Sequence, residues 1–200
     1  KIGVVGKYFS VGDFTLSDAY ISVIEALKHA SWANGKDVEF TWLNSEEYEN
    51  DLSKLKELDH LDGVVIPGGF GSRGIEGKIQ AIKYCRENNI PYLGLCYGMQ
   101  CAVIEYARNV LGWKDANTTE IDTNTSYPVV DLLKGQEENL KDGSYGGTLR
   151  LGAYDCELVD NTISLDAYGT KLIKERHRHR YEFNNKYRKE LEDAGLIVAG

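Results

Sequence analysis

A five-residue stretch, Gly94-Leu95-Cys96-Tyr97-Gly98, constrains the fold of this chain more than any other. It ends a short apolar run, 91–95, that is typical of a buried strand, and it opens a helical pattern over 99–106. A strand that passes into a helix through a turn flanked by glycines is the geometry of a nucleophile elbow, here with cysteine in place of the more familiar serine. The turn presses backbone against backbone, so residues without a Cβ are needed on both sides.

An elbow of this kind exposes the thiol of Cys96 at the carboxyl edge of a sheet and at the start of a helix. The free N–H groups and partial positive charge of a helix N-terminus favour the thiolate, which is a nucleophile. The alternative is that Cys96 is only a small apolar residue in a strand-to-helix joint.

A second candidate is the glycine-rich loop Pro67-Gly68-Gly69-Phe70-Gly71, which follows the apolar run 61–66. Bare backbone N–H groups in such a loop can hold an oxyanion. Loops that follow neighbouring parallel strands lie at one edge of a sheet, so this loop is expected beside Cys96. An ordinary turn remains the alternative interpretation.

Apolar runs alternate with helical patterns along the first half of the chain. Strands are expected at 1–6, 38–43, 61–66 and 91–95, and helices at 17–30, with Ser17 as N-cap, 51–58, 74–87 and from 99. This alternation predicts an α/β fold with a mostly parallel central sheet and helices on both faces.

Periodicity weakens after residue 117, and 135–146 is typical of a solvated loop. We expect a small extension of antiparallel strands over 148–158, a last helix from Asn184 or Asn185 to Ala194, and one more strand at 196–200. The length of 200 residues suits one domain, 1–200.

Composition excludes several classes of protein. The net charge of −8 disfavours nucleic acid and anionic membranes as partners, and no apolar segment is long enough to span a bilayer. Four cysteines without framework spacing indicate reduced thiols and a cytoplasmic location. Cysteines and histidines do not occur at metal-binding spacing, so no metal site is expected.

The run from Arg176 to Glu182 alternates arginine with histidine. In a strand, the arginines would face one way and the histidines the other. The run is either a solvated basic edge strand or a guanidinium clamp for a carboxylate, and composition alone leaves both open.

The residues 94–100 closely resemble the nucleophile motif of class I glutamine amidotransferases. Three other stretches, 67–71, 146–152 and 176–182, narrow the resemblance to the glutaminase domains of the CTP synthase family, and the match covers 1–200. The resemblance implies a flavodoxin-like sheet and a single amidotransferase domain.

The resemblance also implies a reaction. Cys96 would attack the side-chain amide of L-glutamine and release ammonia, and water would hydrolyse the resulting thioester. Backbone N–H groups of Gly69 and Tyr97 would stabilise the oxyanion. The other implied glutamine-binding residues are Gly98, Met99 and Gln100 in the pocket, Glu120 at the substrate ammonium and Arg180 at its α-carboxylate.

Two departures from the family pattern stand out. Tyr97 occupies a position where the family often has leucine, and little effect is expected beyond the pocket rim. The family's base and orienting acid lie in a His-Pro-Glu segment, which does not occur in this sequence. General-base catalysis commonly contributes a factor of about 10²–10⁴, so we expect this chain to hydrolyse glutamine weakly or not at all.

The resemblance implies no cofactor in this domain. It implies a synthetase domain that aminates UTP with ATP and Mg, GTP as allosteric activator, and a homotetramer of the full-length protein, whereas a fragment such as this one is expected to be monomeric. No phosphate-binding loop occurs here, so ATP is not expected to bind in that way. The alternatives are a cysteine-dependent hydrolase or deglycase of similar fold and a non-catalytic glutamine-binding module.

Overall fold

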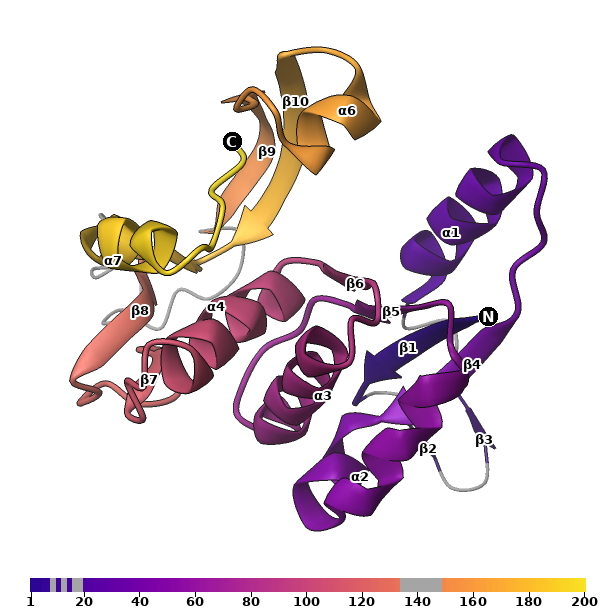
Figure 1. Ribbon diagram of the computed structural model, residues 1–200, viewed down its shortest axis with the longest axis horizontal. Helices are drawn as coiled ribbons and strands as arrows, with labels where there is room; N and C mark the ends of the chain where they lie inside the picture. The colour runs from indigo at the N-terminus through magenta and orange to yellow at the C-terminus, as the bar shows by residue number, and fades with distance from the viewer. Residues whose placement is uncertain (8–9, 12–13, 16–19, 134–148) are drawn as a thin grey trace. The chain divides into compact units, whose positions relative to one another are not determined.

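A computed structural model describes residues 1–7, 10–11, 14–15, 20–133 and 149–200 (Figure 1). It divides into two compact units, 1–105 and 106–200, and the boundary falls inside helix α4 (Tyr97–Asn109). Each unit is described by itself, and the expectation of one amidotransferase domain over 1–200 stays a prediction. Within the described ranges, no helix has the length and apolar character needed to cross a membrane.

The first unit is built on a four-stranded sheet in the order β4-β1-β5-β6, with every neighbouring pair parallel. Its strands are β1 (Ile2–Gly6), β4 (Phe40–Asn44), β5 (Gly63–Ile66) and β6 (Tyr92–Gly94). Separately, β2 (Ser10–Val11) pairs antiparallel with β3 (Phe14–Thr15). The predicted mostly parallel central sheet is therefore confirmed.

The order of the strands determines where the loops that follow β1 and β5 lie at the carboxyl edge of the sheet. The chain passes from β1 to β4 in one direction and then to β5 and β6 in the other. Right-handed crossovers in opposite directions put their helices on opposite faces of the sheet, as predicted. The loops after β1 and β5 therefore diverge at the carboxyl edge, which is where such sheets bind ligands.

The helices of this unit are α1 (Ile21–Ala33), α2 (Ser45–Asn50), the 3₁₀ helix η2 (Leu52–His60), α3 (Ile75–Glu87) and the first part of α4. Helix α1 packs Ile24 against Val4 and Tyr20, with Phe40 and Trp42 around them. The predicted cap of α1, Ser17, lies outside the described residues.

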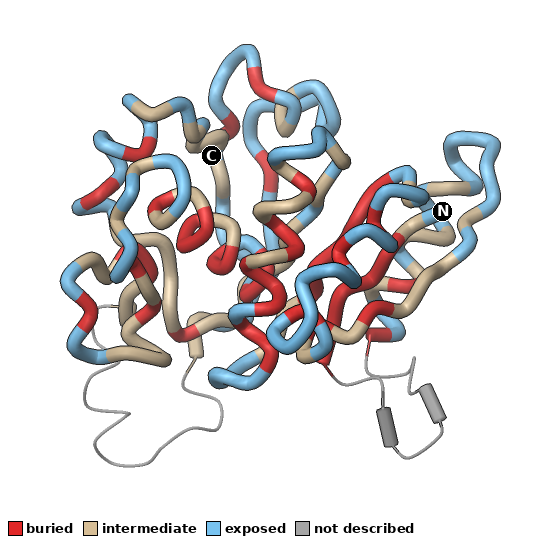
Figure 2. The backbone as a smooth tube through the Cα atoms, turned by 60° about the horizontal axis from the view of Figure 1, so that its bottom comes forward, coloured by how far each residue is buried: buried red, intermediate tan, exposed pale blue. Residues whose placement is uncertain are grey.

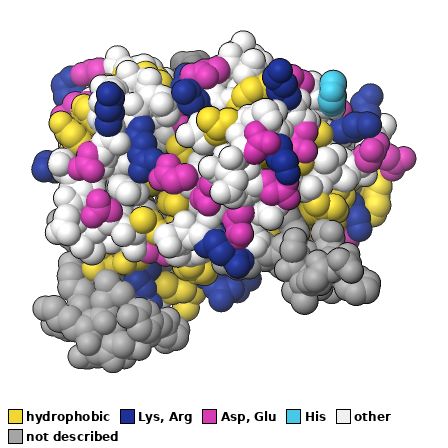
Figure 3. Space-filling model, turned by 90° about the horizontal axis from the view of Figure 1, so that it is seen from below, with side chains coloured by type: hydrophobic (Ala, Val, Ile, Leu, Met, Phe, Trp, Pro, Cys, Tyr) yellow, Lys and Arg dark blue, Asp and Glu magenta, His cyan; other side chains and the backbone are white. Residues whose placement is uncertain are grey.

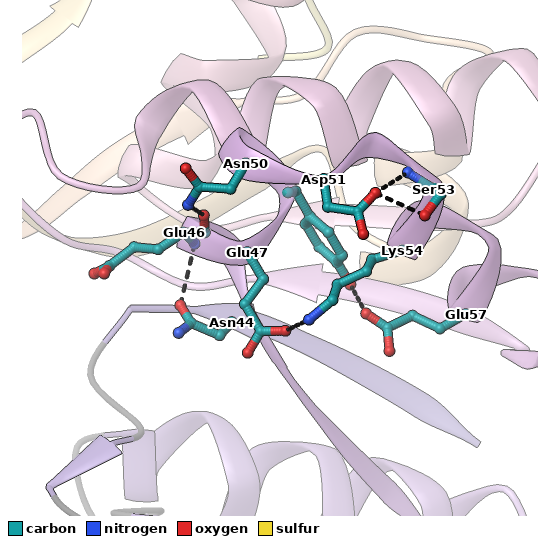
Figure 4. Close-up of polar contacts among 9 residues, drawn as sticks. Asn44, Glu46, Glu47, Asn50, Asp51, Ser53, Lys54 and Glu57 are labelled. Carbon is teal, nitrogen blue, oxygen red and sulfur yellow. Dashed lines mark hydrogen bonds and ion pairs between the residues drawn. The ribbon is translucent and has the colours of Figure 1, made fainter.

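The region 45–60 differs from the single polar helix predicted at 51–58, because it contains α2 followed by η2 (Figure 4). The Asn44 side chain accepts a hydrogen bond from the N–H of Glu46 at 3.1 Å and starts α2. The Asp51 carboxylate accepts from the N–H of Ser53 at 2.9 Å and starts η2. Two successive caps divide the segment into two short helices.

The second unit contains a three-stranded sheet, β11-β8-β7, and the antiparallel pair β9–β10. Its elements are β7 (Ala116–Thr118), β8 (Tyr127–Leu132), β9 (Arg150–Glu157), α6 (Ile163–Tyr168), β10 (Leu172–His179), β11 (Tyr181–Phe183), η3 (Asn185–Tyr187) and α7 (Arg188–Asp193). The antiparallel extension is as predicted, and Asn184 caps η3 by accepting from the N–H of Lys186.

In this unit two strands were not predicted, one expectation is wrong, and one cannot be compared. Strands β7 and β8 form in a segment where the sequence has little periodicity. Residues 196–200 form no strand: the Leu196 N–H donates back to the Leu191 carbonyl of α7 at 3.0 Å, and the Ala199 carbonyl accepts the Val159 N–H at 2.8 Å. The solvated loop expected at 135–146 lies outside the described residues.

Buried residues concentrate in β1 and β5 and recur along α3 (Figure 2). Cys85 on α3 is 1% exposed and belongs to this core. Acidic and basic side chains are interspersed over the face in Figure 3, in keeping with a mixed surface.

An ion pair between Arg86 and Glu105 connects α3 to α4. The guanidinium of Arg86 donates to the carboxylate of Glu105, with Nη2 to Oε1 at 2.7 Å and Nε to Oε2 at 3.0 Å. The Glu105 side chain is 1% exposed, whereas that of Arg86 is 33% exposed. A carboxylate this deeply buried depends on its bidentate partner.

We therefore expect Arg86→Ala to lower the free energy of unfolding by about 3 kcal/mol, because it removes the bidentate guanidinium partner of a buried carboxylate. Chemical denaturation monitored by circular dichroism measures this. The matched control is Lys83→Ala, whose ion pair with Glu87 is 4.0 Å long and exposed on the same helix. Equal small effects of the two substitutions would contradict the prediction.

Candidate active site

Cys96 lies between β6 and α4, and its backbone is left-handed. Its φ is +51°, and its side chain is exposed. A residue with a Cβ rarely adopts this conformation, and it persists only where the surroundings enforce it. The strand, turn and helix form the elbow geometry predicted from the sequence.

The flanking glycines make the turn possible, because without a Cβ they let neighbouring backbone segments approach closely. A Cβ at Gly98 would lie 2.1 Å from the carbonyl oxygen of Ile66, and one at Gly94 would lie 2.6 Å from the carbonyl carbon of Gly98. Backbone bonds hold the same place, because the Leu95 N–H donates to the Ile66 carbonyl at 3.0 Å and the Gly98 N–H to the Leu95 carbonyl at 2.9 Å. The elbow is thus pressed against the end of β5.

The start of α4 sets the electrostatics of the thiol. The carbonyl of Cys96 accepts the N–H of Gln100 at 3.1 Å, so Cys96 stands at the cap position of a 13-residue helix. The partial positive charge of that helix end favours a thiolate over a thiol.

The glycine-rich loop 67–71 lies against Cys96. A Cβ at Gly68 would be 3.4 Å from the Cβ of Cys96 and 3.8 Å from its Sγ. Gly69, which follows Gly68 in this loop, is half-buried. The structure therefore brings together the two features that the sequence places on separate strands, as an oxyanion site requires.

Two side chains hold the far end of this loop. The Tyr97 hydroxyl donates to the Gly71 carbonyl at 2.7 Å, and the Lys7 ammonium donates to the Phe70 carbonyl. The Tyr97 side chain is 1% exposed, so it turns inward rather than lining a rim. Sequence reasoning missed this role, although the departure from leucine at Tyr97 was a signal for it.

The remaining residues predicted for the pocket of the first unit follow Tyr97 on α4. Met99 is 41% exposed, whereas Gln100 is 4% exposed and Gly98 is buried. Arg73, after the glycine-rich loop, pairs with the Glu46 carboxylate at 2.8 Å and donates to the Lys7 carbonyl at 2.9 Å.

Glu120 and Arg180 belong to the second unit. Glu120 is half-buried in the turn after β7, and its N–H donates to the Thr118 hydroxyl at 3.3 Å. Arg180 is 6% exposed at the bend between β10 and β11, where its carbonyl accepts the Leu133 N–H at 3.0 Å. Their roles toward a substrate stay predictions.

The arginine–histidine run forms the end of β10. Arg176 and Arg178 are exposed, and the burial of Arg180 sets it apart from them. On the other face, His177 Nδ1 lies 2.8 Å from His179 Nε2, and burial lowers the pKa of both imidazoles. The solvated-edge interpretation therefore fits the first two arginines of the run but not the third.

The elbow also has a buried cation near it that sequence reasoning missed. Lys78 on α3 is 0% exposed, and its Nζ lies 5.4 Å from the centroid of the Tyr97 ring. Burial lowers the pKa of Lys78 to about 8. Within the described part of the chain, no group of three or more His, Cys, Asp and Glu side chains could hold a metal ion.

Comparisons with known proteins agree with this geometry. Residues 15–200 match the family model described as glutamine amidotransferase class-I. The chain therefore belongs to the class I glutamine amidotransferase family. Within that family it is similar to CTP synthases, being 56% identical to the one from Clostridium beijerinckii and 52% identical to the one from Bacillus subtilis over its whole length. It spans 36% of the length of each of these relatives.

A solved structure extends the match to the fold. The glutaminase domain of Trypanosoma brucei CTPS with bound acivicin superposes with a TM-score of 0.88 at 39% identity, covering 99% of this chain and 73% of that one. These findings confirm the resemblance to class I amidotransferases and to glutaminase domains of CTP synthases, as well as the predicted fold class.

We expect Gly98→Ala to disrupt the elbow, because the new Cβ meets a backbone carbonyl that cannot move aside. It should lower stability by about 2 kcal/mol or more and slow alkylation of Cys96, as measured by denaturation and by mass spectrometry after iodoacetamide treatment. Gly63→Ala on β5 is the control, since a Cβ there would have its nearest neighbours at 3.5 Å. Normal alkylation of the Gly98→Ala protein would contradict the assignment.

The lowered pKa of Lys78 predicts a pH dependence of stability. Between pH 8 and about 10.4 the unfolded chain holds a proton on this lysine that the folded protein has released, so stability should rise with pH in that window. Lys78→Met removes this contribution. From pH 7 to 10, the free energy of unfolding of the parent chain should gain about 2 kcal/mol relative to Lys78→Met. Parallel pH profiles for the two proteins would show that Lys78 titrates normally.

Proposed function

We propose that this chain is the glutaminase part of a CTP synthase, which hydrolyses L-glutamine at Cys96 and supplies ammonia to another part of the protein. The observation that carries the proposal is the exposed, left-handed cysteine at a helix start, in contact with the glycine-rich loop 67–71. The similarity to a CTPS glutaminase domain over 99% of the chain supports it.

The chemistry follows from the position of the sulfur. The Cys96 thiolate attacks the side-chain carbonyl carbon of glutamine and forms a carbon–sulfur bond. The oxyanion lies toward the N–H groups of Gly69 and Tyr97, whose backbones the elbow and loop fix in place. The carbon–nitrogen bond then breaks, the nitrogen takes up a proton and leaves as ammonia, and a γ-glutamyl thioester remains. Water hydrolyses the thioester to glutamate and regenerates Cys96.

The rest of the pocket is assigned by resemblance. Gly98, Met99 and Gln100 line the glutamine side chain, Glu120 faces the substrate ammonium, and Arg180 pairs with the α-carboxylate. The burial of Arg180 supports the last role, because a buried guanidinium favours a paired carboxylate. The expected weakness of turnover without a His-Pro-Glu segment also stays a prediction.

The activity of the whole protein is a further part of the proposal. The ammonia aminates UTP to CTP in a synthetase domain that uses ATP and Mg, with GTP as activator and a tetrameric assembly. The chain spans 36% of its curated relatives, so these steps concern protein outside the 200 residues. Four free cysteines support a cytoplasmic location.

A glutamine-mimicking diazo-ketone tests the proposal, because it alkylates a thiolate only when the pocket holds it in place. We expect one adduct on Cys96, detected by mass spectrometry of the digested chain, and protection of Cys96 by excess L-glutamine. Cys96→Ser should abolish labelling, whereas Cys156→Ser, at a half-buried cysteine of the other unit, should leave it unchanged.

Two other outcomes of this experiment would each favour a different class of protein. Labelling of Cys96 without protection by glutamine would favour a cysteine-dependent hydrolase or deglycase. Absence of an adduct in folded protein that still binds glutamine would favour a non-catalytic binding module. Both outcomes would overturn the proposal.

A further inference from the structure

Lys78 carries a charge in a place that disfavours charge. Its side chain is fully buried on α3, and its Nζ has no hydrogen-bond partner among the residues that the structure describes. Burying an ammonium without a partner is costly, and methionine would fill the same space without that cost. A lysine here is therefore unfavourable for stability unless a nearby group gains from the charge.

Few groups around Lys78 can compensate for its burial. Two ammonium groups lie over the Tyr97 ring, with Lys78 Nζ at 5.4 Å and Lys7 Nζ at 5.8 Å from its centroid. The ring attracts each cation, but the two lysines repel each other, and this repulsion lowers the pKa of Lys78 further. On α2, the Glu49 carboxylate accepts the N–H of Gly77 at 3.4 Å.

Among the described residues, two cysteines on or next to α4 supply the negative charge that acts on the pKa of Lys78. Burial lowers this pKa, whereas ionised Cys101 and, by a smaller effect, ionised Cys96 raise it. Coupling of this kind is reciprocal, so the ammonium favours ionisation of the sulfurs by the same free energy. Cys101 is 0% exposed and not at the helix end, whereas Cys96 is exposed at the helix start, so Cys96 is the sulfur that ionises more readily.

We propose that Lys78 is a positioning residue for the nucleophile: its buried ammonium, seated against the Tyr97 ring, stabilises the thiolate of Cys96. The inference rests on the proposed function in that Cys96 is the nucleophile. The Lys78 ammonium is then a second source of positive charge for the thiolate, besides the N-terminus of α4. It also accounts for a lysine whose burial disfavours folding.

The test measures the thiol directly and does not depend on glutamine. The rate of alkylation of Cys96 by iodoacetamide is followed from pH 5.5 to 10 by mass spectrometry of its peptide in the 200-residue chain. In Lys78→Met the midpoint should move to higher pH, with a rate at pH 7 about 3- to 10-fold lower and an unchanged rate at pH 10. Lys78→Arg, which keeps the charge, should retain most of the parent rate.

Two controls separate charge from structure. Lys83→Met, at a lysine on the same helix whose side chain is 38% exposed, should leave the profile unchanged. Cys101→Ala should also leave the Cys96 midpoint in place, and a shift there would mean that Lys78 acts on Cys101 instead. A Lys78→Met profile that is unchanged, or lowered equally at every pH, would overturn the inference.

A reciprocal measurement avoids any variant of the lysine. In Cys96→Ser the thiolate is gone, so the pKa of Lys78, read from the ¹³Cε chemical shift of labelled lysine, should fall. An unchanged pKa would overturn the inference. Diazo-ketone labelling of Cys96 with an unmoved Lys78→Met midpoint would reject this inference alone, whereas a moved midpoint without such labelling would reject the proposed function alone.

Discussion

The close approach between the end of β5 and the start of α4 is the constraint on which the site depends. The Ile66 carbonyl occupies the space that a side chain at position 98 would need, and the same carbonyl accepts the Leu95 N–H. The chain can then turn only through a left-handed residue, which is Cys96. Strain in one residue is thus balanced by the packing of two elements, and the exposed sulfur is its result.

Much of the first unit could be predicted because its signals are local. Buried parallel strands produce apolar runs, and amphipathic helices between them produce a 3.6-residue period, so β1, β4, β5, β6, α1, α3 and α4 all fall near their expected places. The elbow was predictable for a similar reason, because glycines at both 94 and 98, between an apolar run and a helical pattern, are typical of a crowded strand-to-helix turn. The segment around α2 was harder, because Asn44 and Asp51 create two caps within eight residues.

The rest depended on contacts between residues distant in sequence. Strand β8 pairs with β7 on one side and with β11 on the other, and such short, half-buried strands leave little pattern in the sequence. The inward turn of Tyr97 and the burial of Lys78 depend on how α3 and α4 pack, which periodicity cannot specify. Arg180 was recognised through resemblance alone, since its burial is set by the bend between β10 and β11.

The order of the strands has a consequence for synthesis on the ribosome. Strand β1 is made first, yet it lies between β4 and β5, so its second edge stays open until residues 63–66 have left the exit tunnel. Until then an apolar strand with unpaired amides is present on the nascent chain, which is a template for aggregation. Pausing of translation before β5 would prolong that exposure, so demand for chaperones should be greatest while β5 and β6 are being made.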